Sequence, residues 1–283
     1  TGVLLRDTVT EKIGNSAAIT RQARYSAFTN SEVLAVGDHR AKADRKYTVA
    51  SKATYLSGVA RNYITSPDSA AASITGDIEI VARLTATDWT EASAQTVLGK
   101  IRNLNVDESY WFNIDAGSTG KLEIFTSPDG TSGSRVSATS TVAVPFSDGD
   151  TGWIKVTLDV DDGAGNRVYK FYTAAYSIDE PTSWTQLGTT ITTAGTTSID
   201  DNASGLTVGA FGASGSQQAL GGSIEVVKVR NGIDGTLAVS FDANDYSTGS
   251  TLTSSATGEV YTLIGSANTV KPGTVLSTIE STD

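Results

Sequence analysis

The stretch from Gly152 to Thr173 constrains the fold most, because it consists of two alternating segments on either side of a glycine-bearing turn. One face of the first segment is apolar and comprises Ile154, Val156, Leu158 and Val160. Successive side chains of a strand point to opposite faces, so this alternation predicts a strand with one buried face and one wet face. The second segment places Tyr169 and Phe171 on one face in the same way, which completes a β-hairpin.

The turn and the composition favour antiparallel sheet throughout the chain. The turn sequence DDGAGN contains Asp, Gly and Asn, which tolerate the backbone angles of a reversal. Similar alternating runs follow one another from Tyr55 onward, and several of them end in Gly, Asp or Asn. A chain of 283 residues with 39% hydrophobic content can fill one large core. We therefore predict an all-β fold, an antiparallel β-sandwich of the jelly-roll type.

Charge divides the chain into a basic first part and an acidic body. Residues 1–52 hold nine Lys or Arg against five Asp or Glu, a net charge of +4. The remaining residues hold 12 basic and 26 acidic side chains, a net charge of -14. Because residues 1–52 also lack clean alternation, we expect an irregular N-terminal arm there, with room for one or two short helices, that needs a partner surface. A sandwich over 53–267 and a loosely held tail over 268–283 complete the expected organisation.

Several segments of the body resemble a LamG-like, concanavalin A-like jelly-roll domain. The resemblance lies in YLSGVARNYITSPDS, GDIEIVARL, SYWFNI, KLEIFTSPDG, GWIKVTLDVDDGAGNRVYKFY, LTVGAFG and GSIEVVKVRNGI, and it covers about residues 53 to 267. The sequences ITSPDSAA and TTAGTTSI resemble segments of tailed-bacteriophage virion structural proteins. The resemblance implies two curved antiparallel sheets packed face to face. In relatives, the concave face or the rim loops bind glycans or proteins, and some relatives bind calcium at the rim.

The resemblance and the charge division together predict a non-enzymatic virion structural protein at the particle surface. It would be a capsid decoration or cement protein, or a minor capsid or tail protein, that docks through its arm on the major capsid or tail proteins of the same virion. The expected docking residues are Arg6, Lys12, Arg21, Arg24, Tyr25, Phe28, Arg40, Arg45 and Lys46. A homo-oligomer is expected, because arm-exchanged sandwiches close readily under rotational symmetry.

Nucleic acid and membrane are not expected as partners. The acidic body would repel a phosphate backbone. No apolar run approaches the roughly 20 residues that a membrane-spanning helix needs.

The alternative is a carbohydrate-binding adhesin module that contacts host-surface glycans. Exposed aromatic rings stack on sugar faces, whereas buried rings fill the core. The aromatic candidates for glycan contact are Trp89, Tyr110, Trp111 and Trp184. Packing in the core or at the rim is the competing interpretation of each of these four residues.

The turn of the hairpin is also the candidate for a metal. Its oxygen-bearing side chains suit Ca²⁺ and are Asp159, Asp161, Asp162 and Asn166. Turn formation explains the same residues, so no cofactor is expected, with Ca²⁺ as the one alternative.

An enzyme is not expected from the residues that could carry catalysis. The sequence has no Cys, and its only histidine, His39, lies in a charged segment. Asp77 and Glu79 alternate as a glycosidase pair would, but no third carboxylate follows them on the same face. We interpret them as part of a solvated outer face of a strand.

Overall fold

The structure is a computed structural model that describes residues 9–13, 17–21, 46–211, 217–268 and 270–280, with side chains for 51–211, 217–267 and 270. It divides into two compact units, one of residues 1–52 with 272–283 and one of residues 53–271. In the first unit, β1 (Val9–Ile13) and β2 (Ala17–Arg21) pair as a two-stranded antiparallel sheet. These two segments are strands where the sequence left room for short helices, because β1 contains β-branched Val, Thr and Ile and β2 contains Ile and Thr.

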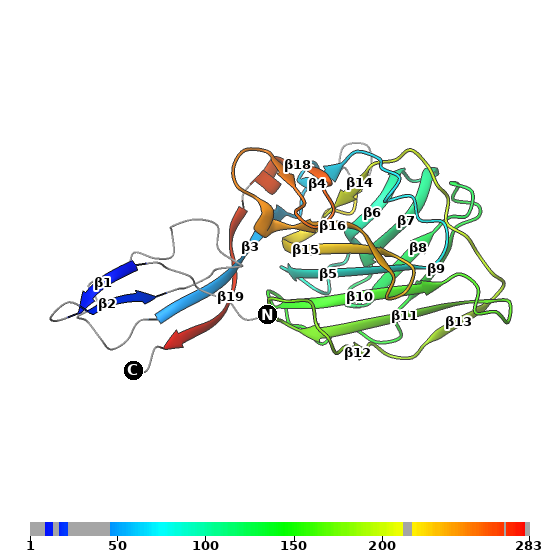
Figure 1. Ribbon diagram of the computed structural model, residues 1–283. Coiled ribbons are helices and arrows are strands. Elements are labelled where there is room, and N and C mark those ends of the chain that lie inside the picture. The colour runs from blue at the N-terminus through cyan, green and yellow to red at the C-terminus, as the bar shows by residue number, and fades with distance from the viewer. Residues whose placement is uncertain (1–8, 14–16, 22–45, 212–216, 269, 281–283) are drawn as a thin grey trace. The chain divides into compact units, whose positions relative to one another are not determined.

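The second unit contains an eight-stranded sheet and most strands of a nine-stranded sheet, and Figure 1 shows these two antiparallel sheets packed face to face. The nine-stranded sheet has the order β12 (Thr185–Gln186), β11 (Asn166–Ala175), β10 (Thr151–Asp159), β5 (Ile78–Ala86), β15 (Gly221–Asn231), β3 (Lys46–Ser57) and β19 (Val270–Glu280). Off this path lie β13 (Ile191–Ala194), which pairs with β11, and β16 (Thr236–Asp242), which pairs with β15. The expected hairpin is present as β10 and β11, with Val156 opposite Phe171.

The second sheet of the sandwich is the eight-stranded sheet. Its order is β17 (Thr251–Thr253), β18 (Val260–Ile264), β4 (Tyr63–Ser66), β14 (Leu206–Val208), β6 (Gln95–Asn103), β7 (Val106–Ile114), β8 (Leu122–Thr126) and β9 (Val136–Thr139). Two short 3₁₀ helices, η1 (Ala243–Asp245) and η2 (Gly265–Asn268), complete the described elements. Within these ranges, no helix has the length and apolar character to traverse a bilayer.

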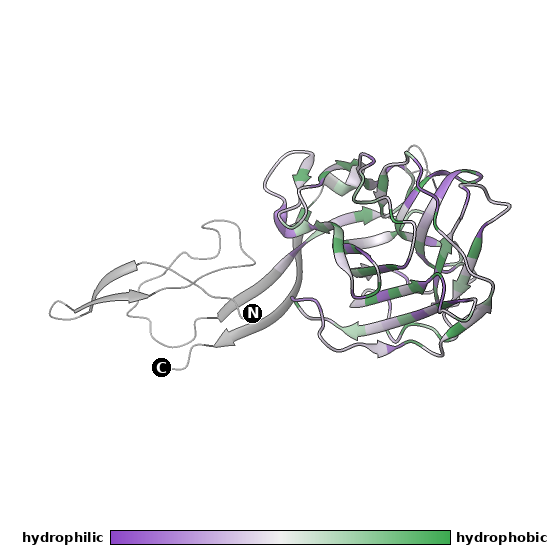
Figure 2. Ribbon diagram, turned by 45° about the vertical axis from the view of Figure 1, so that its right-hand side comes forward, coloured by the Kyte–Doolittle hydropathy of each residue, from purple (hydrophilic) through white to green (hydrophobic). Residues whose placement is uncertain are grey.

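The main core is a single cluster of buried apolar side chains that the two sheets enclose. Ile154, Val156 and Leu158 of β10 and Tyr169 and Phe171 of β11 are fully buried in it, as the alternation predicted. Burial of one such apolar side chain contributes about 1.5–3 kcal/mol, so this cluster drives the pairing of the sheets. Figure 2 shows hydrophobic and hydrophilic residues alternating along many of the strands.

The outer face of the nine-stranded sheet is covered by a segment that we call the strap (residues 176–184). The carbonyl oxygens of Ser177 and Ile178 in the strap accept hydrogen bonds from the Arg83 guanidinium. Glu180 pairs with Lys228 and Arg230 of β15 at 2.8 Å each. The face of β10 that the sequence predicted to be wet is therefore shielded: Lys155 is 8% exposed and Thr157 is 2% exposed. A period-2 pattern shows which residues share a face and does not reveal a distant segment that covers it.

A β-bulge in β15 positions the carboxylate of Glu225 on this outer face. The register of β15 against β5 shifts between Ile224 and Val226, so that Glu225 is the extra residue. Glu225 forms an ion pair of 2.8 Å with Arg83, and both side chains are at most 1% exposed.

The end of the chain differs from the sequence expectation. Val270–Glu280, expected as a loosely held tail, is strand β19 and lies beside β3 in the nine-stranded sheet. Pairing with a neighbouring strand satisfies backbone N–H and C=O groups that a tail would leave to water.

Candidate functional site

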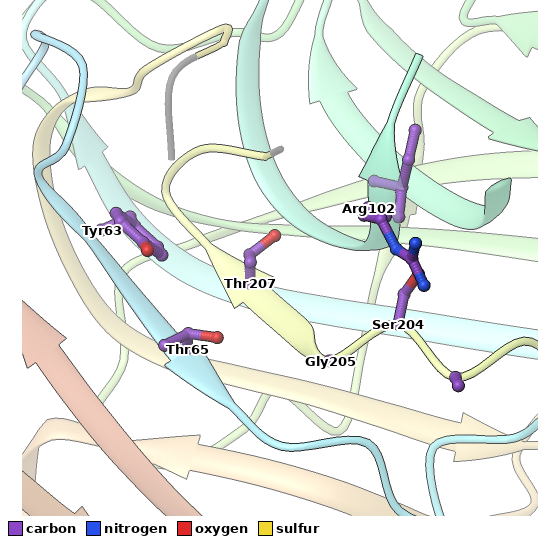
Figure 3. Close-up of a pocket in the computed structure, with 8 residues that line it drawn as sticks. Tyr63, Thr65, Arg102, Ser204, Gly205 and Thr207 are labelled. Carbon is purple, nitrogen blue, oxygen red and sulfur yellow. The ribbon is translucent and has the colours of Figure 1, made fainter. Parts of the chain in front are cut away.

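A pocket of about 210 Å³ opens on the outer face of the eight-stranded sheet. Figure 3 shows its labelled side chains on β4, β6, β14 and the chain that leads into β14. Ile64, Leu206 and Val208 of β4 and β14 point into the core, so the alternating residues face outward into the pocket. The lining residues are Tyr63, Thr65, Ile101, Arg102, Ala203, Ser204, Gly205 and Thr207.

The two threonine hydroxyl groups of this pocket already donate their protons to backbone carbonyl oxygens. Thr65 Oγ1 donates to the carbonyl oxygen of Leu206 at 3.1 Å, and Thr207 Oγ1 donates to that of Gly99 at 3.1 Å. A hydroxyl that has donated its proton keeps two acceptor lone pairs. The two threonines therefore offer acceptor positions to a ligand that carries O–H groups.

Arg102 supplies the donors of the pocket. Its guanidinium pairs with Asp107 at 2.7 Å, and its side chain is 56% exposed. A guanidinium has five N–H donors, so the pair with one carboxylate leaves donors that point to solvent. Tyr63 also lines the pocket, but it is only 9% exposed and so offers little ring surface to a ligand.

The wall of the pocket is held in place by a buried lysine. Lys100 Nζ donates to Asp68 Oδ1 at 2.6 Å and to the carbonyl oxygens of Asn202 and Ser204 at 2.6 and 2.9 Å. Three acceptors match the three N–H donors of an ammonium group, which compensates for its full burial. The wall is therefore pre-formed, which lowers the entropy cost of binding.

A glycine lets the same wall approach β4. A Cβ atom on Gly205 would lie only 2.5 Å from the carbonyl oxygen of Ser66. A larger residue would push the backbone of residues 203–205 away from β4, so the shape of the pocket depends on glycine at this position.

The chemistry of the lining suits binding. Its side chains provide hydroxyl groups, one guanidinium, one phenol and a few apolar groups, without a carboxylate, imidazole or thiol. General acid–base and nucleophilic catalysis most often use those missing groups. The pocket can therefore hold a polar ligand, and its lining offers little for proton transfer.

Most of the aromatic candidates lie in the protein interior. Trp89, Tyr110 and Trp111 are at most 1% exposed. Trp89 and Tyr110 belong to the main core, and Trp111 packs against Phe125 at a centroid distance of 4.6 Å. The expectation that these three rings contact glycans is corrected, because a buried ring has no face to offer to a sugar.

Trp184 is the one aromatic candidate that is only partly buried, at the end of the strap. Its ring lies edge-on to Trp153, with centroids 6.3 Å apart. Lys155 Nζ lies 4.9 Å from the ring centroid of Trp184 and 4.9 Å from that of Tyr172. Trp184 stays a candidate, but it lies on the other sheet from the pocket and does not contribute to it.

The oxygen-rich turn of the hairpin uses its carboxylates for its own backbone. Asp162 Oδ1 accepts from the backbone N–H groups of Ala164 and Asn166 at 2.8 and 3.1 Å. Asp161 and Asp159 accept from the N–H groups two residues further on. These hydrogen bonds lower the pKa of Asp162, led by the one from the Asn166 side chain. In the described part of the chain, no group of three or more His, Cys, Asp or Glu side chains is placed to hold a metal ion.

Glu79 does not lie on a solvated face as expected. It is 1% exposed beneath the strap, and it pairs with Arg230 at 3.0 Å and with Lys155 at 3.6 Å. Its neighbour in the alternation, Asp77, accepts a hydrogen bond from the N–H of Val160 at 2.9 Å. Ion pairs and a backbone contact thus occupy both carboxylates.

The predicted docking residues mostly fall outside the described part of the chain. Those outside are Arg6, Arg24, Tyr25, Phe28, Arg40 and Arg45, and His39 is outside as well. Lys12 lies in β1, Arg21 in β2 and Lys46 in β3, where only the backbone is described. The docking role of these residues stays a prediction.

Sequence reasoning missed the pocket itself. The pocket is lined by Thr65, Arg102 and Thr207, among others. These residues are far apart in the chain and meet because β4, β14 and β6 are neighbours in the sheet. The only local signal is a threonine at the outward position of each of two short strands.

No protein-family model and no curated protein sequence matches the chain. Among solved structures, it is similar to a protein from Bacteroides ovatus ATCC 8483 named as a candidate carbohydrate-binding protein, with a TM-score of 0.51 and 14% identity over 81% of this chain and 62% of that one. The chain thus spans less than two thirds of that protein.

Two further solved structures resemble the chain at lower TM-scores. They are the LG4-5 domains of the mouse laminin α1 chain (TM-score 0.41, 17% identity, 75% of this chain and 47% of that one) and a heptameric SAP-like pentraxin from Limulus polyphemus (0.40, 11%, 64% and 76%). At such identities, likeness shows the fold alone, and the scores below 0.5 add no weight. The two antiparallel sheets confirm the predicted all-β sandwich, and the similarity to the Bacteroides protein agrees with this fold. Nothing in these comparisons bears on a bacteriophage particle.

Proposed function

We propose that the sandwich of residues 53–271 is a non-catalytic glycan-binding module and that the pocket between β4, β14 and β6 is its sugar site. The observation that carries this proposal is the lining itself. Thr65 and Thr207 present acceptors, and Arg102 presents donors. Sugars carry O–H groups that both donate and accept hydrogen bonds, so they match both kinds of group.

The volume of the pocket limits the size of the ligand that it can hold. Pockets for drug-sized ligands have about 300–1,000 Å³, and this one has about 210 Å³. A single sugar ring at the end or at a branch of a glycan suits this volume better than the middle of a long chain. The name of the Bacteroides protein, a candidate carbohydrate-binding protein, supports the same class of ligand.

A glycan array with the full chain tests the proposal, followed by titration of the strongest ligand. Thr207→Val removes one hydroxyl at nearly constant shape, and Arg102→Ala removes the donors. We expect each variant to bind roughly tenfold more weakly, since one hydrogen bond contributes about 1–1.5 kcal/mol.

Thr192→Val is the matched control, because Thr192 is an exposed strand threonine on β13 of the other sheet. It should leave the affinity unchanged. An array without a bound glycan, or equal affinity in all three variants, would contradict the proposal.

The virion role stays a second proposal that the charge division supports. The +4 charge of residues 1–52 and the -14 charge of the remainder favour docking of the first segment on an acidic protein surface. A module that binds host glycans and an anchor on a particle are compatible in one chain. Localisation of the protein in intact particles by cryo-electron microscopy would test this role.

A further inference from the structure

A second polar cluster lies on the outer face of the eight-stranded sheet, around the turn that joins β7 and β8. Glu123 of β8 is directly opposite Asn113 of β7 on one side and Thr139 of β9 on the other. Asp115 is two residues beyond Asn113 and so lies on the same face. Four side chains that carry oxygen thus share one patch of the sheet.

The two carboxyl groups of this cluster are in contact with each other. Glu123 lies within hydrogen-bonding distance of Asp115, and Thr139 Oγ1 donates to Glu123 Oε1 at 3.3 Å. Among the described residues, no Lys or Arg forms an ion pair with either carboxyl group. Burial and then the charge of Asp115 raise the pKa of Glu123 to about 7, and the hydrogen bond from Thr139 and the charge of Arg135 only partly offset them. Two like charges at this distance require a proton or a cation between them.

A buried oxygen of Asn113 without a hydrogen-bond partner favours a cation over a proton at this cluster. Asn113 is fully buried, and its Oδ1 has no hydrogen-bond partner. Its Nδ2 donates to Gln218 Oε1 at 3.0 Å, and the same oxygen accepts from Thr96 of β6 at 3.2 Å. The nitrogen of the amide is therefore turned toward the β6 side, which leaves Oδ1 on the side of β8 and Glu123. A buried acceptor without a partner costs about 1–3 kcal/mol, which a bound cation would relieve.

We propose that Asp115, Glu123, Asn113 Oδ1 and Thr139 Oγ1 form a site for a hard divalent cation, with Ca²⁺ as the best match. Carboxylate, amide and hydroxyl oxygens are ligands that Ca²⁺ accepts, and water completes its six to eight positions. Nitrogen and sulfur ligands, which zinc prefers, are absent from this cluster. The site is independent of the proposed sugar pocket, which shares none of these residues.

Calcium titration of the full chain tests the site, with the melting temperature and calorimetric heat as readouts. We expect one Ca²⁺ per chain with a Kd of about 0.1–1 mM, as for weak extracellular modules. Binding to the native state should raise the melting temperature with increasing calcium. Glu123→Gln and Asp115→Asn keep the size of each side chain and should each weaken binding at least tenfold.

Asp162→Asn in the turn of the β10–β11 hairpin is the matched control, and it should bind calcium like the parent chain. Circular dichroism of Glu123→Gln distinguishes loss of the site from loss of the fold. Absence of both heat and thermal shift with the parent chain would overturn the proposal. Calcium binding that survives Glu123→Gln, or that disappears in Asp162→Asn, would also overturn it.

Discussion

Glu123 couples the stability of the fold to pH. Burial and the neighbouring Asp115 raise the pKa of Glu123 from 4.5 to about 7, so the folded state binds this proton more tightly than the unfolded chain does. The stabilisation is therefore complete below about pH 4.5 and is lost as pH rises through about 7. We expect Glu123→Gln to be more stable than the parent by about 1–2 kcal/mol above pH 7, after allowance for solvent screening.

Urea unfolding at pH 4 and pH 8, in the presence of a chelator, measures this effect. The two proteins should have similar stability at the acidic pH and differ at the alkaline one. The same pH dependence in parent and variant would show that Glu123 is not the responsible group.

Single residues also show what sequence can and cannot predict. The core positions Ile154, Val156 and Leu158 follow from alternation alone, because burial on one face is a local property of a strand. The burial of Trp89, in the turn after β5, and of Trp111, in β7, does not follow, since neither position alone determines whether the ring faces the interior or solvent. The contact of Asp115 with Glu123 depends on the register of β7 and β8, which no single residue encodes.

At the scale of elements, the position of the strap depends on the ion pairs of Glu180 with Lys228 and Arg230. Burial alone would raise the pKa of Glu180, but hydrogen bonds from Lys228 and Arg230 hold it below the ordinary value. Its contribution to stability is therefore lost as pH falls through this lowered pKa. We expect Glu180→Ala to destabilise the fold by about 1–2 kcal/mol, less than a fully buried pair would cost, because Glu180 is partly exposed.

Limited proteolysis and tryptophan fluorescence report on the strap in this variant. Cleavage within residues 176–184 should become faster, and emission from Trp184 should shift to longer wavelength as the ring meets water. The control is Glu91→Ala, because Glu91 Oε1 accepts only from the next residue's backbone N–H. Equal rates of cleavage in both variants would show that the ion pairs of Glu180 do not hold the strap in place.

Sequence reasoning did not predict the strap, and it described β19 wrongly as a loosely held tail. The strap lacks a periodic pattern, and its position depends on Arg83 and Arg230, which come from other strands. β19 reads as a polar end segment, and its pairing with β3 is a contact between distant parts of the chain. Local patterns indicate that a strand exists more reliably than they identify its partner.

At the scale of the whole molecule, residues 53–271 should fold without the remainder. The ladder between β3 and β15 runs only from Thr54 to Ser57, so it stays intact in this fragment. The buried members of the main core also lie within 56–267. We expect the fragment to melt within a few degrees of the full chain and to keep its glycan affinity.

Thermal unfolding and titration with the array ligand compare the fragment with the full chain. If the first segment is an anchor, the fragment should also fail to attach to particles while it keeps its fold. A fragment that aggregates or melts far below the full chain would show that the sandwich needs the other unit.

The burial of Lys100 has a practical consequence for these measurements. Its ammonium group is sealed from solvent by three oxygen acceptors, so amine-reactive dyes and sensor-chip chemistry will react with lysines away from the pocket, such as Lys170 of β11, instead. Attachment through those positions spares the pocket wall. The protein can thus be labelled or immobilised by the commonest coupling reaction without modification of the lysine that holds the pocket in shape.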